Sequence, residues 1–170
     1  MATVIGRAGK QARPIIPDAY ERVLALAAIT LLAVVLVALV RGAGHWARVP
    51  AIVWAHLLTV LVALVLTPPM LLRPRGDRWH RRLGRVWVIA MLATAALSLG
   101  VRMSHPGHLS FIHLLSLYVL VAAPLIWWTA RTHRVAAHRG QVRGMVTGAL
   151  VLAGFFTLPF GRLLGGWLFG

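Results

Sequence analysis

The sequence contains no cysteine, and this absence removes several kinds of chemistry at once. Structural disulfides, thiolate catalysis and metal sites built on cysteine are all excluded. Among the strong ligands for soft metals and haem iron, histidine remains, with 8 copies, and methionine is a second choice. Any metal or haem chemistry in this chain is therefore expected to depend on histidine.

Acidic residues are nearly as scarce. Asp18, Glu21 and Asp77 are the only 3 carboxylates, and all lie outside the expected membrane spans. Paired-carboxylate catalysis, proton relays through Asp or Glu, and carboxylate-bound magnesium therefore have nothing to use inside a membrane. The chain also lacks a nucleophile elbow, a P-loop and a dinucleotide-binding fingerprint. No common soluble enzyme class is indicated.

Long apolar runs dominate what is present. Hydrophobic residues make up 59% of the chain and the mean hydropathy is +0.80. A soluble protein of this length could not bury so much apolar surface in its core, so a membrane is the expected environment. The predicted fold is an all-α integral membrane protein with five transmembrane helices, at about 23–40, 50–72, 83–101, 109–129 and 145–160. The predicted organisation is a basic cytoplasmic tail (1–22), a peripheral helix facing lipid (23–41), a four-helix core (50–162) and a C-terminal tail (163–170).

The positive charges are distributed unevenly about these spans. Of the 18 Lys and Arg residues, four (Arg41, Arg48, Arg102 and Arg162) fall on one side and the other fourteen on the side of the N-terminus. The positive-inside rule then predicts a bacterial inner-membrane protein with a cytoplasmic N-terminus and an external C-terminus. The net charge of +15 indicates contact with anionic membrane lipids. No nucleic-acid partner is expected, since no soluble stretch is long enough to form a binding domain.

Two halves of the predicted core resemble each other. His56 and His113 each open a descending apolar helix 57 residues apart (113 minus 56), and His80 and His138 each open an ascending helix 58 residues apart (138 minus 80). Residues 54–101 and 111–158 therefore look like two copies of one helical hairpin. Because both copies insert the same way round, their pseudo-two-fold axis runs along the membrane normal, unlike the inverted repeats of many transporters.

This repeat predicts two pairs of facing imidazoles. His56 with His113 would lie near the outer face, and His80 with His138 near the inner face. Two facing imidazoles can hold a haem iron at both axial positions, so the pattern indicates one haem b towards each membrane face. Arginines beside the inner pair, Arg81, Arg82, Arg139 and Arg143, could bind the haem propionates, although each also suits a role in topology or lipid binding.

Other patterns leave alternatives open. His45, His105 and His108 fall near His56 and His113 on the outer side, where a zinc or copper site is a minor alternative. A glycine repeat, Gly140, Gly144 and Gly148, indicates close packing of a helix and suits either a neighbouring helix or a flat cofactor. The 7 tryptophans mostly fall near span ends, as interfacial anchors do.

The core resembles a group of bacterial four-helix membrane proteins classed as a domain of unknown function. The resemblance covers about residues 50–162 and is carried by His56-Leu-Leu-Thr, His80-Arg, Gly84-Arg85, His108 with His113 and Ser116, Pro124, His138-Arg139-Gly140, and Pro159-x-Gly161-Arg162. It implies a fold but no activity. The architecture also resembles the cytochrome b561 group, whose members bind two haems and move electrons across a membrane. That resemblance implies His56 with His113, and His80 with His138, as the haem ligands.

Three functions follow as hypotheses. The first is a haem-b electron carrier, a cytochrome-type oxidoreductase component, with a quinol or a redox protein as partner. The second is a non-catalytic accessory subunit of a larger respiratory or photosynthetic membrane complex, docked through its glycine-lined helix and basic inner face. The third, a small-molecule or metal transporter, is disfavoured by the parallel repeat and the lack of acids within the spans.

Overall fold

The structure is a computed structural model, and it describes residues 16–101, 111–159 and 161–170. Within these ranges the chain is helical and contains no strand. The helices in chain order are α1 (Ala19–Arg41), the 3₁₀ helix η1 (Ala43–Arg48), α2 (Ala51–Leu72), α3 (Arg78–Gly100), α4 (Phe111–Arg131), α5 (Val135–Met145), the π-helix η2 (Val146–Leu152), α6 (Ala153–Phe155) and α7 (Leu163–Phe169).

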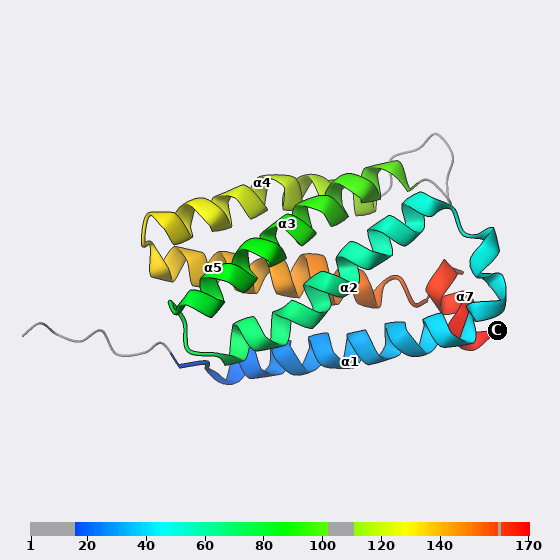
Figure 1. Cartoon of the computed structure of the whole chain (residues 1–170), viewed down its shortest axis with the longest axis horizontal. Helices are drawn as coiled ribbons and strands as arrows, with labels where there is room; N and C mark the ends of the chain where they lie inside the picture. The colour runs from blue at the N-terminus through cyan, green and yellow to red at the C-terminus, as the bar shows by residue number, and fades with distance from the viewer. Residues whose placement is uncertain (1–15, 102–110, 160) are drawn as a thin grey trace, which may run out of the picture.

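The long helices run side by side along the longest axis of the molecule (Figure 1). Sequential neighbours pack together, α1 on α2, α2 on α3, α3 on α4 and α4 on α5, and η2 returns to pack on α1. The helices therefore close into a ring. In this ring α2 and α4 run one way, while α1, α3 and α5 run the other (Figure 1), as the predicted parallel repeat requires.

Among the described residues, four helices, α1 to α4, are long and apolar enough to cross a membrane. The bounds of α2 agree closely with the prediction. The span is expected at 50–72, and the helix runs over Ala51–Leu72. The third helix begins at Arg78, five residues before the predicted start at Leu83, because Asp77 caps it. An N-cap carboxylate accepts a hydrogen bond from an otherwise unpaired backbone N–H, so a helix can start among charged residues.

The fifth segment differs most from its prediction. A span is expected at 145–160; the helical segment found there begins at Val135 and runs through α5, η2 and α6 to Phe155. It is not among the four candidate membrane spans of the described residues, so a fifth crossing stays a prediction. The first part of this helix carries Arg139 and Arg143, which the hydropathy pattern assigns to a loop. These arginines have partners on α1, described below, and paired charges can lie on a packed helix. The middle part is wound as a π-helix, a form that is rare and often found at functional sites.

Helix α1 forms one wall of the ring. The prediction of a peripheral, lipid-facing helix describes only one of its faces, where Val23, Leu26 and Val40 are exposed. The opposite face buries Ala28 and Ala38 completely against α2, η2 and α7. Small residues on that face let neighbouring helices approach closely.

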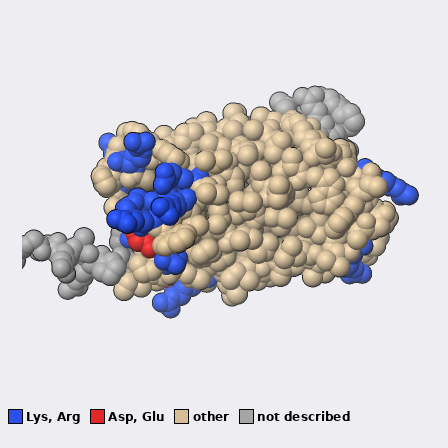
Figure 2. Space-filling view, in the orientation of Figure 1, with Lys and Arg blue, Asp and Glu red and all other residues tan. Residues whose placement is uncertain are grey.

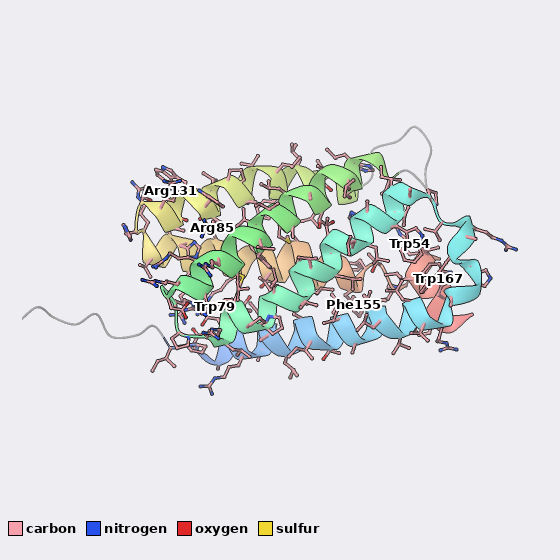
Figure 3. All side chains as sticks on the ribbon, viewed as in Figure 1. Trp54, Trp79, Arg85, Arg131, Phe155 and Trp167 are labelled. Atoms are coloured by element: carbon pink, nitrogen blue, oxygen red, sulfur yellow. The ribbon has the colours of Figure 1, made fainter. Side chains whose placement is uncertain are left out.

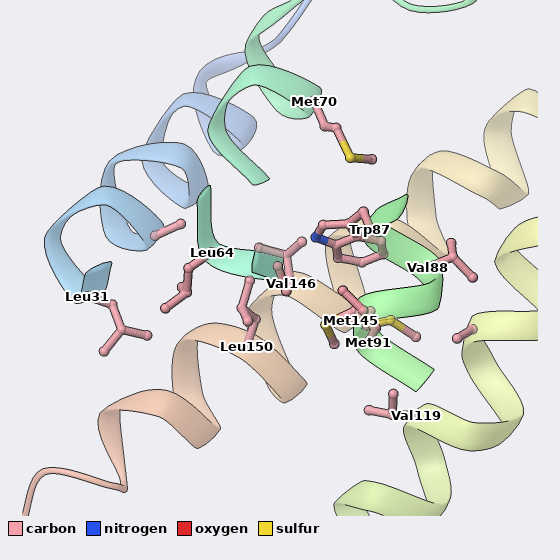
Figure 4. Close-up of a cluster of buried hydrophobic side chains, with 14 of the residues drawn as sticks. Leu31, Leu64, Met70, Trp87, Val88, Met91, Val119, Met145, Val146 and Leu150 are labelled. Atoms are coloured by element: carbon pink, nitrogen blue, oxygen red, sulfur yellow. The ribbon is translucent and has the colours of Figure 1, made fainter. Parts of the chain in front are cut away.

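The centre of the ring is filled by large apolar side chains. Trp87, Leu64, Met91 and Met145 are almost fully buried and lie in one cluster (Figure 4). Trp87 is thus an exception to the expectation that the tryptophans mark the membrane interface. Its indole Nε1 donates to the Thr67 hydroxyl at 2.9 Å, which satisfies the polar atom that burial would otherwise penalise.

Residues 163–170, expected to be a tail, form helix α7 and pack against α1. Gly42, at the end of α1, is needed for this contact, because a Cβ there would lie 2.1 Å from the Trp167 ring. The short helix therefore covers the end of the bundle opposite the start of α1 (Figure 1).

The two ends of the bundle differ in charge. Arginines cluster at the end where α1 begins, α2 and α3 are joined, and α4 passes to α5 (Figure 2). We call this the basic end and the other the outer end. Trp79 lies at the basic end, while Trp54 and Trp167 lie at the outer end (Figure 3). Bands of tryptophan at both ends suit the two interfaces of a bilayer.

Candidate functional site

The basic end brings two of the predicted histidine ligands together. His80, on α3, and His138, on α5, have ring centroids 6.5 Å apart, with ring planes at 81°. They come from helices placed diagonally in the ring, since α4 lies between α3 and α5 in the order of packing. We call these two residues the inner histidine pair. This arrangement agrees with the predicted pairing across the bundle centre.

His80 is positioned by the start of its helix. Asp77 is the N-cap of α3, and its carboxylate accepts the backbone N–H of His80 at 2.6 Å. This hydrogen bond, together with Arg73, holds the pKa of Asp77 below its usual value. The imidazole of His80 is half-buried, and its Nδ1 is a buried atom without a hydrogen-bond partner in the described structure. A buried polar atom that lacks a hydrogen-bond partner in the protein is commonly paired with a ligand or a water molecule.

His138 is fixed by its neighbouring helix. Its Nδ1 lies 3.1 Å from the carbonyl oxygen of Ile126 on α4. Because a carbonyl can only accept, Nδ1 carries the proton in the neutral ring and Nε2 keeps its lone pair. A histidine held this way by a backbone carbonyl has the tautomer and orientation typical of a metal ligand.

A buried ion cluster lies beside the pair. Glu21 of α1 is fully buried, and Arg75, Arg139 and Arg143 surround its carboxylate. Arg139 binds it through two hydrogen bonds, Nε to Oε1 at 2.7 Å and Nη2 to Oε2 at 2.9 Å. Asp18 also contacts Arg139 and Arg143, and the N–H of Glu21 and the Arg143 side chain help to hold the pKa of Asp18 below its usual value. We call this set the Glu21 cluster.

The four arginines predicted to bind propionates fall into two groups. Arg139 and Arg143 belong to the Glu21 cluster, so a propionate would have to compete with Glu21 for them. Arg81 and Arg82 are exposed at the basic end, and Arg81 donates to the carbonyl of Gly76 at 2.6 Å. A propionate role for any of the four stays a prediction.

A small cavity, which we call the inner cavity, joins the inner histidine pair to the Glu21 cluster. It measures about 300 Å³ including space open to the surface, and its enclosed part has room for about one water molecule. Its lining consists of Glu21, Met70, Arg75, His80, His138, Arg139 and Val142. One guanidinium nitrogen of Arg75, Nη1, is buried there without a partner, as is Nδ1 of His80. The inner cavity is thus polar on one side and apolar on the other.

A larger cavity, of about 1020 Å³ including space open to the surface, lies towards the outer end. We call it the outer cavity. All five walls of the ring and α7 contribute to its lining, including Leu31, His56, Thr94, Val119, Leu150 and Leu163. Clefts with a mostly apolar lining and few polar groups are typical of small-molecule sites.

The outer histidines are placed differently from the inner pair. His56 lines the outer cavity, and its Nδ1 lies 3.0 Å from the carbonyl oxygen of Thr94. His113, at the start of α4, is half-buried and is not among the described residues that line that cavity, whereas Leu115 and Ser116 are. A haem between His56 and His113 stays a prediction.

The alternative zinc or copper site gains no support from the residues described. Within residues 16–101, 111–159 and 161–170, no three His, Cys, Asp or Glu side chains gather closely enough to hold a metal ion. His45 is exposed on η1, and His105 and His108 lie outside the described residues.

Glu21 is the functional candidate that sequence reasoning missed. The sequence places it before the first expected span, but in the structure it is fully buried at the centre of the five-residue Glu21 cluster. One signal was present: Asp18-x-x-Glu21 is a capping box, with both of its hydrogen bonds formed in the structure. Its arginine partners lie far along the chain, so no local pattern names them.

A comparison with known protein families, with curated proteins and with solved structures found no match for this chain. The resemblances to the bacterial membrane family and to the cytochrome b561 group stay predictions. The functional argument therefore depends on the site itself.

Proposed function

We propose that this protein is a membrane electron carrier that binds haem b between His80 and His138. The observation that carries the proposal is the 6.5 Å separation of the two ring centroids. A metal–imidazole bond is about 2 Å long, so two rings on opposite sides of one metal ion have centroids about 6 Å apart. The inner histidine pair is close to that separation without any ligand.

The donor chemistry of the pair fits a haem iron. Axial ligation needs neutral imidazole nitrogens and no acid. The Ile126 carbonyl leaves Nε2 of His138 as a free donor, and Nδ1 of His80 is a buried atom that lacks a partner. The enclosed space beside the pair holds about one water molecule, so haem binding would require lining side chains such as Met70 and Val142 to move aside. A methionine side chain adapts readily to such a change.

The chain's own residues would hold the two ligands in place. Asp77 fixes the start of α3, the Ile126 carbonyl orients His138, and the Glu21 cluster ties α1 to α5 and to the loop carrying Arg75. Bound haem would supply one-electron chemistry. The surrounding apolar core, with Trp87 and Met91, would keep water away and so help to set the reduction potential.

The membrane placement belongs to the same proposal. The basic end would face the cytoplasm of a bacterium, since arginine-rich ends of short-loop membrane proteins stay inside. The unbroken helix formed by α5, η2 and α6 would make the fifth crossing, which places α7 at the outer face. The electron donor would be a quinol or a redox protein.

The accessory-subunit function is the second candidate, favoured by the glycine repeat. A Cβ added at Gly140 or Gly148 would have no neighbour within 4 Å, and one at Gly144 would touch only the Tyr118 hydroxyl, at 3.7 Å. The small residues are thus not used to pack a helix of this chain. A helix of a partner subunit could approach there. Stoichiometric co-purification of another chain, without haem, would favour this candidate.

The test of haem binding is the absorption spectrum of protein purified after expression with ample haem. Wild-type protein should show a Soret band and about one haem per chain for the inner site, or two if the outer pair also binds. His80→Ala and His138→Ala should each remove the inner haem, whereas His45→Ala, an exposed histidine, should not. A folded wild-type protein with no Soret band would refute the proposal.

A further inference from the structure

We propose that the outer cavity binds a neutral lipophilic molecule with a hydroxyl head group, and that His56 accepts the hydrogen bond from that hydroxyl. The proposal does not require haem. It draws on three features of the cavity: its lack of charge, the hydrogen bonding of its polar groups, and the way its wall and cover are built.

Charge limits the ligand to a neutral molecule. The described residues that line the outer cavity include no Lys, Arg, Asp or Glu, and most are aliphatic. A carboxylate, phosphate or amine would enter without a counter-ion, and an unpaired charge in an apolar site is strongly disfavoured. The cavity therefore suits an apolar body with an uncharged polar head.

Hydrogen bonding defines the head group. The Thr94 carbonyl holds the proton of His56 on Nδ1, so the nitrogen left for a ligand is Nε2, with its lone pair. The nearby threonine hydroxyls already donate within the chain: Thr94 to Thr59 at 2.8 Å, and Thr59 to the carbonyl of His56 at 2.8 Å. The His56 side of the cavity thus presents an acceptor, and its complement is an O–H donor.

The wall opposite His56 makes room for the ligand's body. The π-helix η2 contributes Ala149 and Leu150, and α6 contributes Ala153 and Gly154. Three of these four residues are small. A π-helix widens the helical turn at the place where it occurs, and such turns are often found at functional sites.

Helix α7 forms the cover. Leu163 and Leu164 line the outer cavity, and Trp167 of the same helix rests against Gly42. An apolar cover at the outer end would separate the cavity from water on that side. A ligand that partitions into the bilayer suits this enclosure better than one that arrives from water.

Two kinds of molecule share this chemistry: a lipid-soluble quinol and a long-chain isoprenoid alcohol. The probes are therefore decylubiquinol and farnesol, each titrated calorimetrically into the detergent-purified full chain. Decylubiquinone and farnesyl methyl ether are matched controls, because they keep the apolar body but lack the hydroxyl hydrogen. The probe that binds more tightly shows whether the ligand class is a quinol or an isoprenoid alcohol. Its matched control should bind roughly tenfold more weakly, because the buried acceptor then lacks a hydrogen-bond partner.

Two substitutions test the site itself. His56→Phe keeps a ring but removes the acceptor, so it should weaken binding by roughly tenfold. Ala149→Phe should fill the cavity and abolish binding, while Ala55→Phe, the same change at an exposed position, should leave binding unchanged. If a variant fails to fold, the matched ligands on wild-type protein still decide the question.

Several results would overturn the proposal. One is equal binding of each hydroxyl compound and its control; another is unchanged affinity in His56→Phe; a third is no binding of either probe. A haem content of two, with the second haem lost in His56→Phe, would also overturn it, because His56 would then be an iron ligand. Absence of a Soret band, by contrast, would refute only the haem proposal.

Discussion

Glu21 is the residue that holds the helices together at the basic end. It is one of 3 acids in the chain, yet three arginines from two separate segments converge on it. Leaving a buried charge without its partner costs about 3–5 kcal/mol, far more than the pair gains over an apolar substitute. The cluster therefore fixes how α1, α5 and the α2–α3 loop meet.

Removing the charge of Glu21 should accordingly destabilise the protein. Glu21→Gln would leave the buried Arg75 without its acid, at a cost of up to about 3–5 kcal/mol, while Arg139 and Arg143 would keep Asp18. Thermal unfolding in detergent, followed by circular dichroism, measures this. Asp18→Asn, at the half-exposed acid of the same cluster, should have a much smaller effect. Equal melting temperatures for Glu21→Gln and wild type would contradict the described role.

Asp77 should give stability a dependence on pH. Its pKa in the folded state is lowered by the His80 N–H and by Arg73, so the carboxylate is stabilising above its unfolded pKa of about 3.9. That stabilisation is lost as the pH falls through the folded pKa. Asp77→Asn should flatten the loss of stability measured as the pH falls below about 4. An unchanged pH profile in the variant would show that the cap contributes nothing.

At the scale of the element, the sequence predicted α2 well and the fifth helix poorly. The α2 span is bounded by Pro50 and by Arg73, and its interior contains no charge, so hydropathy alone defines it. The fifth helix starts among arginines that pair with an acid on α1. Hydropathy cannot distinguish a charge in a loop from a charge paired on a packed helix. The π-helix likewise leaves no pattern in the sequence.

The docking of α7 should be sensitive to one glycine. In Gly42→Ala the added methyl would overlap the Trp167 ring, so Trp167 should move outward at a cost of about 1–3 kcal/mol. Gly44→Ala, two residues further, meets no atom within 4 Å and is the matched control. Tryptophan fluorescence and the melting temperature report both effects. If the two variants behave alike, the contact between α1 and α7 is not as described.

At the scale of the whole molecule, the sequence repeat predicted that His80 and His138 lie close together. The spacing of His80 and His138 indicated that they face one another, and they lie on diagonal helices at the same end. The outer pair could not be judged in the same way, because the rotation of each helix depends on packing that spacing does not encode. No local sequence pattern predicts the outer cavity, because its lining comes from every wall of the ring.

The proposed topology can be tested with single cysteines, because the chain has none of its own. Ala47→Cys at the outer end should react with an impermeant maleimide on intact cells, and Ala136→Cys at the basic end only after permeabilisation. Gly166→Cys, on α7, should label like Ala47→Cys if the fifth segment crosses the membrane. Labelling of Gly166→Cys only after permeabilisation would leave four crossings.

The most direct test of the central claim is the spin state of the haem iron, measured by electron paramagnetic resonance on the oxidised protein. If His80 and His138 bind one iron, the wild-type protein should be low-spin and six-coordinate. His80→Ala and His138→Ala should then give the same result, a high-spin five-coordinate iron or loss of the haem. Both variants retaining the low-spin signal of the wild type would contradict the account.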